Sequence, residues 1–178
     1  MGRQVQEWFG TLARLVVGGV WLAAGSLKVS DGAASVRAVR AYDLLPEAVV
    51  PTVGHALPAF EIVVGLALVA GALTRAVAVA SALLFVAFIV GIASAWARGL
   101  QIECGCFGGG GFDANAADKY PWEIARDAGL LLLSLGLVWR PRTKLALDTY
   151  LFRPLTPIPR EPDDVPADAR EEQAPFHR

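Results

Sequence analysis

Long apolar runs separated by short polar segments dominate this sequence. Four runs, residues 9–27, 49–73, 76–96 and 122–139, approach the roughly 20 apolar residues with which a helix crosses a bilayer. The pattern predicts an all-α integral membrane protein in which residues 1–140 form a four-helix bundle. A cleavable signal is the alternative reading of the first run, because residues 23–25 (AAG) are similar to a cleavage site, but the run is longer than a typical signal core.

The segments that connect these runs differ in length and pattern. Within residues 31–47 the apolar positions follow a 3.6-residue period, which predicts a short helix that lies in the membrane interface and is ended by Pro46. Only a few residues join the second and third runs, so these two helices must be antiparallel neighbours. The connection between the third and fourth runs is long, and it contains both cysteines.

The chain changes character after residue 139. A basic cluster follows the last run, and proline and acidic residues then become frequent. Such a composition cannot bury enough apolar surface to offset the entropy of the chain. We therefore expect residues 141–178 to form a basic juxtamembrane segment followed by a disordered tail.

Composition and charge support a lipid bilayer as the environment of this chain. The hydrophobic fraction is 54%, the charged fraction is only 19% and the mean hydropathy is +0.46. Ordinary soluble domains are about a quarter charged. A formal net charge of -1 argues against a nucleic-acid partner, because binding requires a field that neutralises phosphates.

The distribution of basic residues gives a weak bias to the orientation. Arg3, Arg75 and the basic cluster after residue 139 would all lie on one side of a four-span protein, and the positive-inside rule places that side in the cytoplasm. The long loops would then face outward, where disulfides persist. We expect a multi-pass protein of the cell membrane, with cytoplasmic termini and an extracytoplasmic cysteine loop.

Cys104 and Cys106 are the only two cysteines, and they lie in the sequence ECGCFG. A disulfide between residues i and i+2 closes a very small ring, so its geometry must be strained. Strain raises the reduction potential and makes such a bond labile. A structural disulfide gains stability by closing a long loop, which this pair does not do. Thiol–disulfide exchange is therefore the favoured role of the pair.

Two other interpretations of the cysteines were weighed. A closed zinc site needs about four ligands, and the only histidines, His55 and His177, lie far from the pair in the sequence. We therefore expect no metal. The remaining interpretation is that the cysteines are two incidental small residues in a glycine-rich turn.

Charged residues inside or at the ends of the apolar runs form a second candidate cluster. Topology places all four at the membrane face that carries the cysteines: Lys28, Glu61, Arg126 and Asp127. Ionisable groups within spans usually pair or line a wet cavity. One interpretation is an ion-pair network that locks the helices together. The other is that a carboxylate moves protons for the thiols while a cation favours the thiolate, and the two are compatible.

Several short segments carry a resemblance to a known family. They are residues 23–28 (AAGSLK), 42–46 (YDLLP), 57–61 (LPAFE) with Gly65, 104–108 (CGCFG), and the pair Arg126-Asp127. In this order they resemble the MauE group of the DoxX-like membrane proteins, over about residues 9–139. The resemblance implies a role in disulfide metabolism outside the cytoplasm, beside a thioredoxin-like partner. In the namesake family that role is linked to maturation of methylamine dehydrogenase.

The expected architecture is also similar to that of the vitamin K epoxide reductase-like membrane oxidoreductases, which pass electrons from thiols to a quinone. This chain departs from them, because it has one cysteine pair and a C-x-C spacing. A quinone is the acceptor that this similarity suggests, and no other cofactor is indicated. Two rival functions remain. One is a non-enzymatic scaffold or assembly factor for redox enzymes, and the other is a small transporter that uses Glu61 and Arg126.

Overall fold

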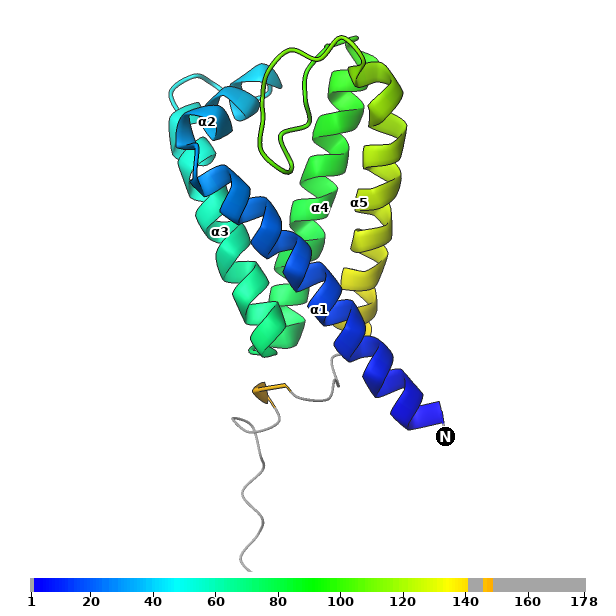
Figure 1. The fold of residues 1–178 in the computed structure, drawn as a ribbon. Coiled ribbons are helices and arrows are strands. Elements are labelled where there is room, and N and C mark those ends of the chain that lie inside the picture. Colours follow the sequence, from blue (N-terminus) through cyan, green and yellow to red (C-terminus); the bar gives the residue numbers. More distant parts are fainter. Residues whose placement is uncertain (1, 141–145, 149–178) are drawn as a thin grey trace, which may run out of the picture.

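The computed structural model describes residues 2–140 and 146–148, and within these ranges the fold is all-helical (Figure 1). The five helices are α1 (Gly2–Val29), α2 (Gly32–Ala41), α3 (Val50–Ala70), α4 (Thr74–Ala97) and α5 (Ala116–Trp139). The disordered tail that the sequence predicts lies outside the described residues. Three of the four predicted apolar runs fall within long helices, and the second, residues 49–73, covers α3 and extends one residue before it and three residues after it.

Three of the described helices, α1, α3 and α4, are long and apolar enough to cross a membrane. The helix α5 has the same 24-residue length as α4. It is not among these three, and five charged residues lie in its first half: Asp118, Lys119, Glu123, Arg126 and Asp127. These three apolar helices make the chain a multi-pass membrane protein.

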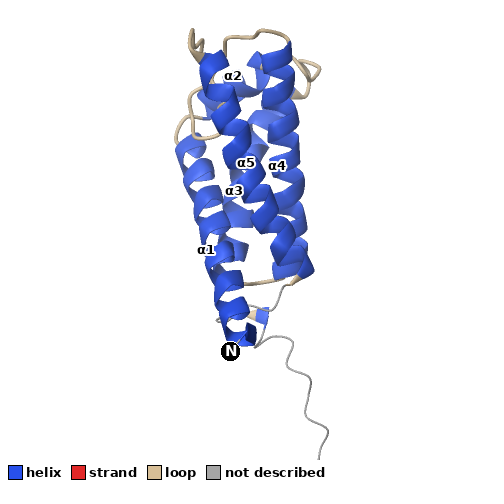
Figure 2. Cartoon of the chain, turned by 90° about the vertical axis from the view of Figure 1, so that its right-hand side faces the viewer, coloured by secondary structure: helices blue, strands red, loops and turns tan. Residues whose placement is uncertain are grey.

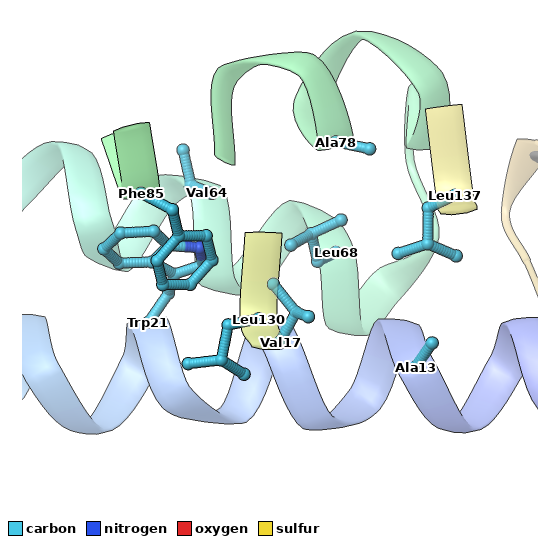
Figure 3. Packing of buried hydrophobic residues seen from close by; sticks show 9 residues of the cluster. All are labelled: Ala13, Val17, Trp21, Val64, Leu68, Ala78, Phe85, Leu130 and Leu137. Carbon is cyan, nitrogen blue, oxygen red and sulfur yellow. The ribbon is translucent and has the colours of Figure 1, made fainter. Parts of the chain in front are cut away.

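The four long helices lie side by side, with α1 packed along α3 and α4 packed along α5 (Figures 1 and 2). Their shared core is centred on Trp21, whose ring centroid lies 4.5 Å from that of Phe85. The indole nitrogen of Trp21 donates a hydrogen bond of 2.8 Å to the hydroxyl of Ser81, which lies 3.0 Å from the hydroxyl of Ser134. The apolar side chains around them are Ala13, Val17, Val64, Leu68, Ala78, Leu130 and Leu137 (Figure 3).

Glycine allows α1 and α3 to approach closely. A Cβ atom added at Gly65 would lie 2.9 Å from the carbonyl oxygen of Gly18, and one added at Gly25 would lie 2.8 Å from that of Pro58. Small residues at helix contacts are the usual means of association in a membrane, because lipid offers no hydrophobic drive for it. Any side chain at these positions would push the two helices apart.

The short helix α2 packs on α3 and compensates for a proline. Pro58 has no N–H with which to satisfy the carbonyl of Gly54 one turn earlier. The hydroxyl of Ser35 in α2 donates a hydrogen bond of 2.7 Å to that carbonyl. The prediction that this helix continues to Pro46 is wrong. The helix ends at Ala41, and the chain then turns through a positive φ of 48° at Asp43.

Residues 146–148 return to the turn between α3 and α4. The carboxylate of Asp148 accepts hydrogen bonds from the amides of Leu73, at 2.7 Å, and Thr74, at 2.9 Å. These amides are among the first N–H groups of α4, which have no partner inside the helix. Asp148 therefore caps a helix that lies far from it in the sequence.

Candidate functional site: a thiol pair at one end of the helices

The connection between α4 and α5 folds back beside α2 and α4 and carries both cysteines (Figure 1). Two tyrosines hold it there. The hydroxyl of Tyr42, just after α2, donates a hydrogen bond of 2.8 Å to the carbonyl of Cys104. The buried hydroxyl of Tyr120 in α5 lies 2.9 Å from the carbonyl oxygens of both Leu100 and Ile102. These contacts fix the start of the loop and the backbone of Cys104.

The glycine run of this loop is explained by close packing. The carboxylate of Glu103 accepts hydrogen bonds from the amides of Gly110, at 2.9 Å, and Gly111, at 3.3 Å. A Cβ atom at Gly110 would lie 2.7 Å from the backbone nitrogen of Ala38 in α2. Five glycines of the loop have a positive φ, which side chains disfavour: Gly99, Gly105, Gly108, Gly109 and Gly110.

The two cysteines are free thiols with different surroundings. Cys106 is buried, whereas Cys104 is partly exposed. The amide nitrogen of Cys106 lies 3.3 Å from the sulfur of Cys104 and donates a hydrogen bond to it. Gly105 allows this geometry, because its φ of 68° turns the chain back between the two residues. Both thiols therefore belong to one compact unit.

Hydrogen bonding separates the acidities of the two thiols. The hydrogen bond from the Cys106 side chain lowers the pKa of Cys104, although burial and the carboxylate of Glu123 oppose this effect. The same hydrogen bond and burial raise the pKa of Cys106. Cys104 therefore ionises at a lower pH than Cys106 does.

Lys28 and Glu61 form a buried ion pair near the cysteine loop. The ammonium nitrogen of Lys28 lies 2.5 Å from Oε1 of Glu61 and 5.1 Å from the centroid of the Phe88 ring. The second carboxylate oxygen of Glu61 is buried and has no hydrogen-bond partner among the described residues. The pair joins the end of α1 to the middle of α3.

Arg126 and Asp127 form the second ion pair, in α5. A guanidinium nitrogen of Arg126 lies 2.8 Å from a carboxylate oxygen of Asp127. The guanidinium carbon of Arg126 lies 4.8 Å from the centroid of the ring of Phe107, which belongs to the cysteine loop. The charges of both residues act on the thiol of Cys106: Asp127 raises its pKa and Arg126 lowers it. The four charged residues therefore form two separate pairs, Lys28 with Glu61 and Arg126 with Asp127, whereas one interpretation of the sequence was a single network.

Cys104 forms part of the wall of two different hollows. The first, which we call the polar pocket, has a volume of about 180 Å³. Its charged lining residues are Glu103, Asp113, Lys119, Glu123 and Arg126. The second, which we call the apolar groove, has a volume of about 220 Å³. Apart from Lys28, Tyr42 and Cys104, its lining residues are Ser35, Ala38, Val39, Leu44, Leu45, Leu57, Ala87, Phe88, Gly91 and Gly105.

The structure gathers all six predicted site residues at one end of the helices, and it adds two that sequence reasoning missed. Tyr42 lies in a segment that was singled out only for its resemblance, and its hydroxyl binds the backbone of Cys104. Glu123 was not among the candidates, yet it lines the polar pocket with Cys104. The sequence offered one signal for Glu123: it lies three residues before Arg126, and residues three apart share a face of a helix.

No group of three or more metal-ligating side chains occurs within residues 2–140 and 146–148.

The fold and the site define an all-helical, multi-pass membrane protein with a thiol pair and two ion pairs gathered at one end. The chain belongs to the family described as methylamine utilisation protein MauE, whose model matches residues 6–140. This confirms the resemblance to the MauE group. Comparisons with curated proteins and with solved structures gave no match.

Proposed function

We propose that this protein is a membrane thiol–disulfide oxidoreductase that exchanges electrons with an extracytoplasmic thioredoxin-like protein through Cys104 and Cys106. The difference between the two thiols carries the proposal. Cys104 is partly exposed, lines the polar pocket and has a lowered pKa, while Cys106 is buried and donates a hydrogen bond to it. An exchanging pair needs one accessible sulfur and one resolving sulfur.

We place the thiol pair at the outer face of a four-span helix bundle. In this arrangement α5 is the fourth span, because it packs along α4, matches its length and exposes apolar side chains such as Leu132 and Leu135. With four spans, the α1–α3 and α4–α5 connections share one side and the chain termini share the other. The cysteine loop then faces an oxidising compartment, and the termini lie in the cytoplasm.

The exchange begins with a disulfide between Cys104 and Cys106. A thiolate of the partner attacks the sulfur of Cys104, because Cys106 is buried. The sulfur–sulfur bond breaks, Cys106 leaves as a thiolate and takes up a proton, and a mixed disulfide joins the partner to Cys104. The second thiolate of the partner then attacks the partner sulfur that is bonded to Cys104. This forms a disulfide within the partner and releases the thiolate of Cys104. The partner is oxidised by two electrons and the cysteine pair is reduced.

The neighbouring groups support this chemistry. The hydrogen bond from Cys106 stabilises the reduced pair, and a stabilised reduced form makes the disulfide a stronger oxidant. Glu123 lies in the polar pocket with Cys104 and is placed to exchange protons with it. Lys28, Glu61, Arg126 and Asp127 hold the helices at this end and supply further proton-transfer groups. The physiological outcome would be disulfide formation in exported enzymes.

Single-cysteine variants test this function. Each variant is mixed with a thioredoxin whose one remaining active-site cysteine carries thionitrobenzoate, and the released thionitrobenzoate is measured by its absorbance. We expect the Cys106→Ser variant, which keeps Cys104, to react about tenfold or more faster than the Cys104→Ser variant. Equal rates would contradict the proposed roles. Full maturation of exported enzymes in cells that carry the double serine variant would instead favour the scaffold.

A further inference from the structure

We propose that the apolar groove binds the ring of a quinone, which accepts the two electrons that reach Cys104 and Cys106. This inference rests on the proposed thiol exchange and names its second substrate. The single observation behind it is that Cys104 lines two hollows of opposite chemistry. A protein partner can reach the cysteine pair from the polar pocket, and a molecule dissolved in lipid can reach it from the groove.

The groove has the size and the lining that a single ring requires. Its volume of about 220 Å³ is below the range of roughly 300–1,000 Å³ that is typical of pockets for drug-sized ligands. Leu44 and Leu45, which follow α2, and Leu57 of α3 form one part of the lining, while Ala87 and Phe88 of α4 form another. A ring would fit there with its isoprenoid tail outside, among the lipid-exposed side chains.

The polar groups in the groove match the acceptor atoms of a quinone. Quinone oxygens only accept hydrogen bonds, and an ammonium group has three donors. The ammonium of Lys28 lines the groove and donates one hydrogen bond to Glu61, so it has donors left for a ligand oxygen. Behind it, the second oxygen of Glu61 is buried and has no partner in the described structure. This arrangement can deliver a proton to a reduced ring.

The reaction balances with a quinone as the acceptor. The Cys104 thiolate and the Cys106 thiol together give up two electrons and form a sulfur–sulfur bond. The quinone gains both electrons and two protons and becomes a quinol. One proton comes from the thiol of Cys106. Lys28 delivers the other, and a proton from the solvent then restores the ammonium.

The test uses the purified full chain in lipid nanodiscs and a photoreactive azidoquinone, with ubiquinone-1 as the unlabelled competitor. Ala87→Trp fills the groove, and Ala93→Trp is the matched control, because Ala93 is exposed on the same helix but does not line the groove. We expect Ala87→Trp to lower the competable labelling about tenfold or more, and Ala93→Trp to leave it unchanged. The double serine variant of the cysteines should still be labelled, since binding does not need the thiols.

Peptide mapping of the labelled wild-type protein keeps the test independent of the variants. Label within residues 28–57 or 87–105 supports the groove. Label elsewhere, or labelling that ubiquinone-1 does not reduce, overturns it. Thionitrobenzoate release separates the two proposals. Normal release without groove labelling overturns the quinone site alone. The opposite result is that the groove is labelled while both single-cysteine variants release thionitrobenzoate at the same rate. That result overturns the thiol exchange and leaves the quinone-binding site in place.

Discussion

The ammonium of Lys28 and the carboxylate of Glu61 are 2.5 Å apart, and only 4% and 0% of their side chains are exposed. The pair bridges α1 and α3 close to the point where Gly25 packs on Pro58. Two charges buried together attract each other strongly, but each has also lost its hydration. The arrangement is therefore tolerated only while both charges are present, and it holds the cysteine end of these two helices in one register.

We predict that Lys28→Met or Glu61→Leu alone lowers the free energy of unfolding by about 3–5 kcal/mol, because each leaves an unpaired buried charge. The double variant should recover most of this loss. Thermal unfolding of the three variants in detergent measures the effect. A double variant whose loss equals the sum of the single losses would show that the two charges do not interact.

The hydrogen bond between the cysteines predicts how Cys104 titrates. In Cys106→Ala the thiol donor is lost while the backbone amide donor remains, so the pKa of Cys104 should rise and its alkylation by iodoacetamide should shift to higher pH. Cys106→Ser keeps a hydroxyl donor and should shift the profile less. The midpoint of the alkylation rate against pH provides the measurement, and identical midpoints in wild type and Cys106→Ala would refute the assignment.

Glu123 predicts a shift in the opposite direction. Its carboxylate raises the pKa of Cys104, so removal of the charge in Glu123→Gln should lower the pH at which Cys104 becomes reactive. Glu47→Gln is the control, because Glu47 pairs with Arg40 at the surface. The same alkylation profile measures both variants. An unchanged midpoint in Glu123→Gln would mean that this carboxylate does not act on the thiol.

Asp148 predicts a pH-dependent contribution to stability. Partial burial raises its pKa, but hydrogen bonds from Thr74 and Leu73 and the charge of Arg14 outweigh this, so its pKa lies below the ordinary value. The contribution is therefore present above about pH 4 and is lost as the pH falls through the lowered pKa.

We expect the variant Asp148→Asn to lower the free energy of unfolding by about 1 kcal/mol at neutral pH, which is the usual effect of losing a helix cap. The difference from wild type should shrink in acid. Thermal unfolding at neutral and acidic pH measures it, with Asp118→Asn as an exposed control. A difference that stays constant down to low pH would show that the charge of Asp148 is not responsible.

Much of the local structure could be predicted from composition alone. An apolar run of about 20 residues forms a helix in a membrane, because every backbone N–H and C=O must be satisfied within the segment. This is why the runs appear as α1, α3, α4 and α5 with small errors at their ends. The end of α2 was predicted less well. The apolar period continued past Ala41, and the turn at Asp43 could not be read from it.

The sequence by itself determined the helices, the position of the thiol pair in a glycine-rich connection and the set of charges at the same membrane face, because these depend on neighbouring residues and on chain order. Only the tertiary structure decided which groups meet. It paired Lys28 with Glu61, brought Tyr42 to the carbonyl of Cys104 and Asp148 to the start of α4, and placed Cys104 between two hollows. Such contacts depend on the rotation and depth of each helix against its neighbours. Packing of the whole chain sets these quantities, and local hydrophobic patterns do not specify them.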